Sequence, residues 1–123
     1  ILAAVAIPAY TDYTIRARVQ EGVSLSTPSR TQLGIVCSEG LFSSGLAQTG
    51  SVLDLPAAAT ITSKYVGSVT VAVASTSAAT VTIATQNLGS GAVGTIVYSG
   101  TCNAAGLRWV ITGSLDSKYL PKR

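Results

Sequence analysis

The sequence predicts an α+β fold in which a long N-terminal helix packs on a four-stranded antiparallel β-sheet. A change of period along the chain supports this prediction. Ile15, Val19 and Val23 recur at helical spacing, whereas apolar and polar residues alternate from residue 65 onward. A sheet of this kind needs a cover on one face. The amphipathic part of the helix is the only candidate for that cover.

The helix is expected to begin in an almost wholly apolar run, ILAAVAIPAY, at residues 1–10. This run is too short to cross a bilayer, which takes about 20 residues, and it is expected to be the distal half of a longer hydrophobic helix. Pro8 removes a backbone donor, so a kink or a locally unwound stretch is expected there. Asp12 and Arg16 are spaced to form an ion pair on the helix surface.

Further along, Gly22 and Pro28 weaken helix propensity, but Leu33 and Val36 indicate that the helix continues to about Cys37. At 123 residues the chain fits one structural domain. Its expected regions are the helix at 1–37, a connecting loop at 38–64, and the sheet with the C-terminal segment at 65–123. Leu41, Phe42 and Leu46 are expected to anchor the loop.

Four short alternating runs predict the strands. They contain Val69, Val71 and Val73; Val81 and Ile83; Ile96 and Tyr98; and Leu107, Trp109 and Ile111. The connections carry Ser-Thr-Ser at 75–77, Gly-Ser-Gly at 89–91 and Asn-Ala-Ala-Gly at 103–106. Short strands with short links are typical of an antiparallel meander.

The two cysteines, Cys37 and Cys102, are too far apart in sequence for a CxxC metal or redox motif. A disulfide is the simplest interpretation, and two buried free thiols in a cytosolic protein are the alternative. The disulfide would stabilise the fold by roughly 4 kcal/mol in the chain-entropy model. It would also imply an oxidising compartment.

The composition argues against an enzyme. Charged residues make up 11% of the chain, against about a quarter in an ordinary domain. The chain has no His and only five acidic residues, which excludes His-based triads, His-ligated zinc and haem, and clustered-carboxylate calcium sites. No catalytic residue, cofactor or metal is predicted. A self-associating or exported structural protein is favoured.

The net charge of +3 lies wholly in the last 16 residues. This segment contains one acidic residue, Asp116, and four basic residues: Arg108, Lys118, Lys122 and Arg123. One interpretation is a solvated tail. The other is a weak patch for anions such as DNA or a polyanionic surface.

Three blocks of the sequence resemble type IV pilins. Residues 1–22, ILAAVAIPAYTDYTIRARVQEG, resemble the N-terminal helix of that family after the first part of its hydrophobic half. Residues 61–71, ITSKYVGSVTV, resemble the start of the pilin sheet, and residues 118–121, KYLP, resemble its closing segment. The blocks stand in the family's order and together span most of the chain.

The resemblance implies a structural subunit that is anchored in the inner membrane, assembled by the pilus machinery, and incorporated with other pilin subunits into an extracellular filament. Such filaments serve adhesion and twitching motility, with DNA uptake as a further task. The methylated N-terminus of the family would lie upstream of Ile1. The residues implied for filament assembly are Ile1, Leu2, Val5, Ile7 and Pro8, with Tyr10 and Tyr13 at the edge of the filament core.

The C-terminal region departs from the family pattern. Many pilins close a C-terminal loop with a disulfide, but the corresponding places here, residues 109–111 and 121–123, contain no Cys. The C-terminal loop is therefore expected to be arranged differently. The alternative function is a minor or competence-type pilin that binds DNA or a surface through the four C-terminal cations, with Tyr119 stacking on a base. A pseudopilin with a calcium site is disfavoured, because only Asp116 is available there.

Overall fold

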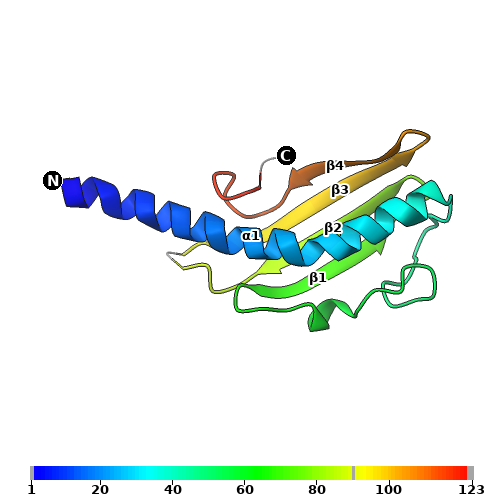
Figure 1. The fold of residues 1–123 in the computed structure, drawn as a ribbon, viewed down its shortest axis with the longest axis horizontal. Coiled ribbons are helices and arrows are strands. Elements are labelled where there is room, and N and C mark those ends of the chain that lie inside the picture. The colour runs from blue at the N-terminus through cyan, green and yellow to red at the C-terminus, as the bar shows by residue number, and fades with distance from the viewer. Residues whose placement is uncertain (1, 90, 122–123) are drawn as a thin grey trace.

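The computed structural model describes the backbone of residues 2–89 and 91–121, and the side chains of these ranges from Tyr10 onward. A single α-helix, α1 (Leu2–Ser38), is followed by a short 3₁₀ helix, η1 (Ala58–Thr60). Four strands follow: β1 (Val66–Val73), β2 (Ala78–Thr85), β3 (Thr95–Asn103) and β4 (Gly106–Thr112). Figure 1 shows α1 lying along one face of the sheet, with its N-terminal part extending beyond the sheet. The predicted α+β fold is confirmed.

The sheet is a simple meander in the order β1-β2-β3-β4, with every neighbouring pair antiparallel. The register places Val71 opposite Val81, Val81 opposite Tyr98, and Tyr98 opposite Ile111. Because side chains alternate between the faces of a strand, this row runs across one face of the whole sheet. That face meets α1, and the core lies between the two layers.

The helix face that contacts the sheet is narrow and has small residues in its middle. Its buried positions repeat at alternating steps of three and four: Ile15, Val19, Gly22, Ser26, Ser29, Leu33 and Val36. A Cβ atom added at Gly22 would stand only 3.0 Å from Cγ2 of Ile83. Ser26 is fully buried, and its hydroxyl donates to the carbonyl of Val23 at 2.8 Å. The small residues therefore let α1 approach β1 and β2 closely.

The expected third member of the apolar stripe, Val23, is only half-buried. Gly22 and Ser26 occupy the contact face at this level, so Val23 is rotated to the side of the helix that faces β4. The prediction failed here because close packing selects small residues, which a search for apolar periodicity does not detect.

The helix is continuous through Pro8, Gly22 and Pro28. Local unwinding at Pro8 is therefore absent from the isolated chain. Residues with poor helix propensity are tolerated at Gly22 and Pro28 because packing against the sheet, rather than intrinsic propensity, supplies most of a helix's stability in a folded protein.

The loop between α1 and β1 is anchored by Phe42 and Leu53, both buried, with Leu46 half-buried. Leu41 was expected to be an anchor as well, but its side chain is 48% exposed. Leu53, which the sequence did not single out, fills the core position instead. The expectation of a loop held against the core is correct for Phe42 and Leu46 and wrong for Leu41.

Gln48 closes the outer edge of the sheet at β1. Its Oε1 accepts from the Val71 N–H at 2.9 Å, and its Nε2 donates to the Val69 carbonyl at 3.0 Å. The side-chain amide thus pairs with the strand as a backbone peptide would, which protects an edge that is otherwise open to another strand.

Replacing Gln48 by Leu is expected to lower the free energy of unfolding by about 1–3 kcal/mol, because two part-buried backbone groups lose their partners. Urea unfolding followed by circular dichroism measures the loss. Gln48→Glu is the companion variant: it keeps the acceptor for Val71 but turns a carboxylate oxygen toward the carbonyls of Val69 and Pro56, so it should also be destabilising at neutral pH and regain stability when the carboxylate is protonated. Equal stability of Gln48→Leu and the parent chain would show that the amide does not protect this edge.

Candidate functional site

The N-terminal part of α1 extends beyond the sheet. Ile15 is the first described residue of α1 that is buried against the core. On its N-terminal side, Tyr10 and Tyr13 are 75% and 71% exposed. Figure 1 shows this part of the helix, in dark blue, extending beyond all four strands. Two large amphipathic side chains are thus presented to solvent on a projecting helix, as suits a protein interface.

Most of the residues expected to mediate assembly stand further toward the N-terminus. Ile1 and the side chains of Leu2, Val5, Ile7 and Pro8 lie outside the described residues. The backbone of residues 2–9 is helical and continues the axis of α1.

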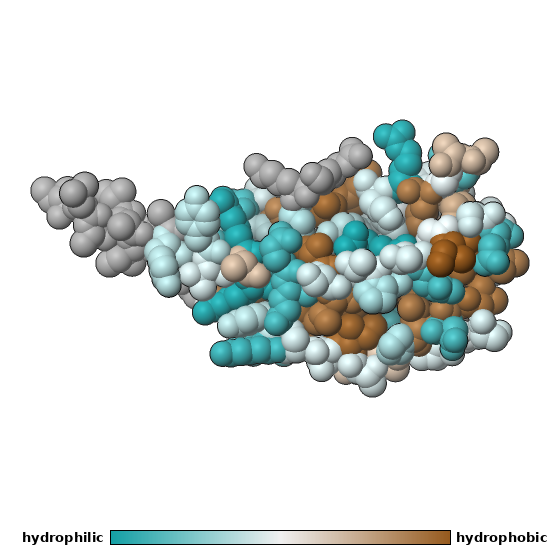
Figure 2. All heavy atoms as spheres, in the orientation of Figure 1, coloured by the Kyte–Doolittle hydropathy of each residue, from teal (hydrophilic) through white to brown (hydrophobic). Residues whose placement is uncertain are grey.

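The C-terminal segment is fastened to α1 near the point where the helix leaves the sheet. The Tyr119 hydroxyl donates to Oδ1 of Asp12 at 3.0 Å, and Nε of Arg16 donates to the Lys118 carbonyl at 3.1 Å. Nζ of Lys118 lies 3.8 Å from the same Asp12 oxygen. Figure 2 shows hydrophilic residues gathered around this part of the molecule.

These contacts correct two expectations. Within residues 2–89 and 91–121, Asp12 pairs with Lys118 and not with Arg16, because both helix side chains turn toward the C-terminal segment. Tyr119 is buried, so it is not placed to stack on a nucleic-acid base. A hydrogen bond with Tyr119 and the nearby Asp12 carboxylate raise the pKa of Lys118.

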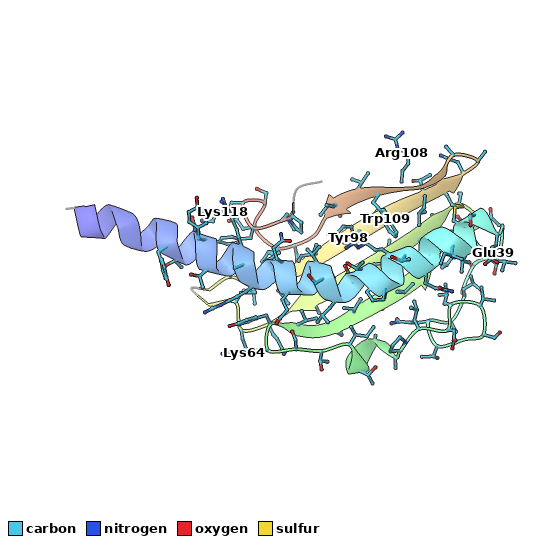
Figure 3. All side chains as sticks on the ribbon, in the orientation of Figure 1. Glu39, Lys64, Tyr98, Arg108, Trp109 and Lys118 are labelled. Atoms are coloured by element: carbon cyan, nitrogen blue, oxygen red, sulfur yellow. A yellow bond between two sulfur atoms is a disulfide. The ribbon has the colours of Figure 1, made fainter. Side chains whose placement is uncertain are left out.

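Among the described residues, the basic side chains of the C-terminal region lie apart from one another. Arg108 is exposed on β4, whereas Lys118 lies near the projecting end of α1, as Figure 3 shows. Lys122 and Arg123 lie outside the described residues. The anion patch therefore stays a prediction, without a described cluster to support it.

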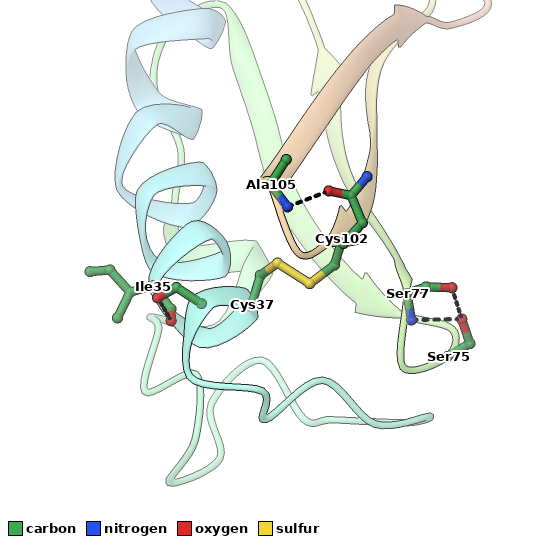
Figure 4. Close-up of a disulfide and its surroundings, with 8 residues drawn as sticks. Ile35, Cys37, Ser75, Ser77, Cys102 and Ala105 are labelled. Carbon is green, nitrogen blue, oxygen red and sulfur yellow. Dashed lines mark hydrogen bonds between the residues drawn. A yellow bond between two sulfur atoms is a disulfide. The ribbon is translucent and has the colours of Figure 1, made fainter.

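The disulfide joins Cys37, in the last turn of α1, to Cys102 in β3 (Figure 4). Its Cα atoms are 5.8 Å apart, and it closes a sequence separation of 65 residues. The predicted bond is therefore present. It locks the C-terminal end of α1 onto the sheet, while the opposite end of the helix projects freely from the fold.

The described residues contain no group of three or more His, Cys, Asp or Glu side chains that could hold a metal ion. Across the same part of the chain, no helix is both long enough and apolar enough to span a bilayer.

A projecting helix on a disulfide-locked α+β head agrees with the comparison to known proteins. The family described as Pilin (bacterial filament) matches residues 15–123. The chain belongs to the type IV pilins. Fimbrial protein EcpC of Eikenella corrodens is 34% identical over 124 residues, an alignment that covers 98% of this chain and 77% of that protein.

Membership of this family settles the class of function. The pilin is a structural, non-enzymatic subunit that polymerises with other pilin subunits into a filament on the bacterial surface. The sequence resemblance to type IV pilins and the argument against an enzyme are both confirmed.

Sequence reasoning missed the residues that set how α1 sits on the sheet. A search for large apolar residues does not include Gly22, Ser26 and Ser29, although they continue the helical spacing of Ile15 and Val19. That spacing was the available signal. Gln48 offered no signal, because its partners lie in β1, more than 20 residues along the chain.

Proposed function

We propose that this pilin assembles through the projecting part of α1, which packs with the same segment of neighbouring subunits in the core of the filament. The proposed core residues are Ile1, Leu2, Val5, Ile7 and Pro8, with Tyr10 and Tyr13 at the edge of the core. The observation that carries this proposal is the departure of α1 from the sheet before Ile15, which leaves Tyr10 and Tyr13 uncovered.

The apolar run at residues 1–10 supports the same proposal. A head of this size has little surface left over for such a run, and a contiguous apolar segment of this kind is typical of a site of protein or membrane interaction. The same segment would serve first as part of an inner-membrane anchor and then as the assembly surface, with the assembly machinery transferring the subunit from one to the other.

The filament is proposed to serve adhesion and twitching motility, with DNA uptake as a further task. The support is the relationship to a fimbrial protein, and the Cys37–Cys102 disulfide agrees with an exported subunit. The alternative of a DNA-binding minor pilin depends on the four C-terminal cations. No contact among the described residues favours it over the structural subunit.

Removing residues 1–14 is expected to abolish polymerisation and leave a folded monomer, because the buried face of α1 begins at Ile15. Sedimentation and negative-stain electron microscopy compare this shortened chain with the full protein. Since the deletion also removes Asp12 and its contact with Tyr119, a second variant carries Tyr10→Asp and Tyr13→Asp with Asp12 intact. Thr70→Asp, exposed on the far face of the sheet, is the matched control and should polymerise normally. Filaments formed by the chain without residues 1–14 would overturn the proposal.

A further inference from the structure

A groove runs between α1 and β4, the strand at one edge of the sheet. The inner side chains of β4 are only half-buried, unlike those of β2 and β1. The groove has a volume of about 520 Å³, within the range of about 300–1,000 Å³ that holds small ligands. Val23 and Arg30 of α1 border it opposite Tyr98, Leu107, Trp109 and Ile111.

Two aromatic rings form the floor of the groove. Trp109 and Tyr98 meet edge to face with their centroids 6.1 Å apart. The indole rests over Gly100, where an added Cβ would stand 2.8 Å from Cζ3 of Trp109. Figure 3 shows both aromatic residues between α1 and β4. The absence of a side chain at position 100 is what lets the indole lie here and line the groove.

A cation without a carboxylate partner stands in the same groove. The Arg30 guanidinium lies 4.3 Å from the centre of the Tyr98 ring. Its Nε donates to the Ser26 hydroxyl at 3.1 Å, and its Nη2 donates to the Val23 carbonyl at 3.1 Å and to the Thr27 hydroxyl at 3.2 Å. Within the described ranges Nη1 has no hydrogen-bond partner, and no carboxylate lies within ion-pair distance of Arg30.

The other polar side chains of the groove can also donate, Gln20 and Tyr98 among them. Burial raises the pKa of the Tyr98 hydroxyl, although Arg30 opposes the shift. The hydroxyl is therefore protonated at neutral pH and can donate. Arg108 stands exposed at the rim, and no Asp or Glu lines the groove. The groove thus matches a ligand that brings acceptors and negative charge.

We propose that this groove binds an acidic saccharide, whose carboxylate pairs with Arg30 and whose sugar ring lies against Trp109. Nη1 of Arg30 keeps its hydrogens free among the described residues and can donate a charge-assisted hydrogen bond to a carboxylate, and a part-buried guanidinium that lacks an acidic partner gains from an anion brought to it. The apolar face of a pyranose ring suits the indole, and its hydroxyl oxygens accept from Tyr98.

The groove suits an acidic sugar better than it suits single-stranded nucleic acid. Nucleic-acid grooves follow the phosphate backbone with a continuous track of cations and stack successive bases on several aromatic rings. Here Trp109 is the only tryptophan of the chain, and Lys118 lies toward the other end of the molecule, paired with Asp12. The proposal goes beyond filament assembly and does not depend on it, because all the residues concerned lie in the head.

The fluorescence of Trp109 reports directly on the groove, since no other residue of the chain is a tryptophan. The 123-residue chain is titrated with trigalacturonic acid, with its neutral methyl ester, and with a short oligothymidylate. We expect a saturable change with the acidic trisaccharide that is at least about tenfold tighter than with the ester, because a charge-assisted pair is lost in the ester.

Arg30→Gln should weaken binding of the acidic trisaccharide by about tenfold. The matched control is Arg18→Gln, which removes another part-buried arginine of α1 that lies over a tyrosine, 5.0 Å from the centre of the Tyr65 ring and away from the groove. Arg108→Gln is a second test variant. Because Arg108 is exposed at the rim of the groove, this substitution should not disturb folding. Circular dichroism verifies that each variant is folded.

The proposal is overturned by any of the following titration results: no saturable change at millimolar trisaccharide, equal binding of the ester, tighter binding of the oligothymidylate, or no effect of Arg30→Gln. A spectrum that changes with protein concentration alone would assign the groove to a second copy of the chain and would also overturn it.

Discussion

Removal of the Cys37–Cys102 disulfide is expected to lower the free energy of unfolding by about 4 kcal/mol, as the chain-entropy model gives for a loop of this length. Domains of ordinary stability have only about 5–15 kcal/mol in total, so the loss would be a large fraction of the stability. The melting temperature should fall by about 15 °C. Among the described residues, this bond is the one covalent cross-link between side chains of α1 and the sheet. When it is removed, the C-terminal end of α1 should loosen first.

Urea unfolding of three samples measures this effect: the oxidised chain, the chain with its disulfide reduced, and the Cys37→Ser, Cys102→Ser double variant. The reduced chain and the double variant should agree with each other, which separates the loss of the cross-link from the effect of the serine side chains. A loss below about 1 kcal/mol in both would contradict the chain-entropy estimate for this fold.

Replacement of Gly22 by Leu is expected to destabilise the pilin by about 3 kcal/mol, because α1 and β2 are too close there to admit a side chain. The Cβ alone would meet Ile83 Cγ2 at 3.0 Å and Val66 Cγ2 at 3.4 Å. Relief would require α1 to move away from the sheet, which would open the contacts of Ser26 and Ser29 as well.

Gly34 provides the matched control for this substitution. It lies in the same helix, and an added Cβ at this position would have no atom within 4 Å. Gly34→Leu should therefore leave stability unchanged or raise it by up to about 1 kcal/mol, through the better helix propensity of Leu. If thermal melts show the two substitutions to be equally destabilising, the close contact at Gly22 does not determine how α1 packs.

Much of the fold was predictable because it depends on local patterns. The alternation around Val69, Val81, Ile96 and Trp109 follows from the two faces of a sheet, and short Gly- and Ser-rich links leave little choice but a meander. The disulfide was predictable because the chain has only two cysteines.

The rest depended on contacts between distant segments, which periodicity does not encode. Arg16 was expected to pair with Asp12 within the helix, but its better partner is a carbonyl more than 100 residues along the chain. Tyr119 and Leu53 are buried because of where loops return to the helix and the sheet. The groove beside Arg30 arises because α1 approaches β4 and still leaves the inner side chains of that strand half-buried.

The proposed assembly through the projecting helix can be tested directly by the chemical accessibility of Tyr10 and Tyr13. Each is replaced by Cys in turn and labelled with a maleimide in the free subunit and in assembled filaments; the native cysteines are disulfide-bonded and do not react. Thr70→Cys, on the exposed face of the sheet opposite α1, is the control. The account predicts that Tyr10→Cys and Tyr13→Cys react in the subunit and are protected in the filament, while Thr70→Cys reacts in both. Equal labelling of all three positions in intact filaments would contradict assembly through this helix.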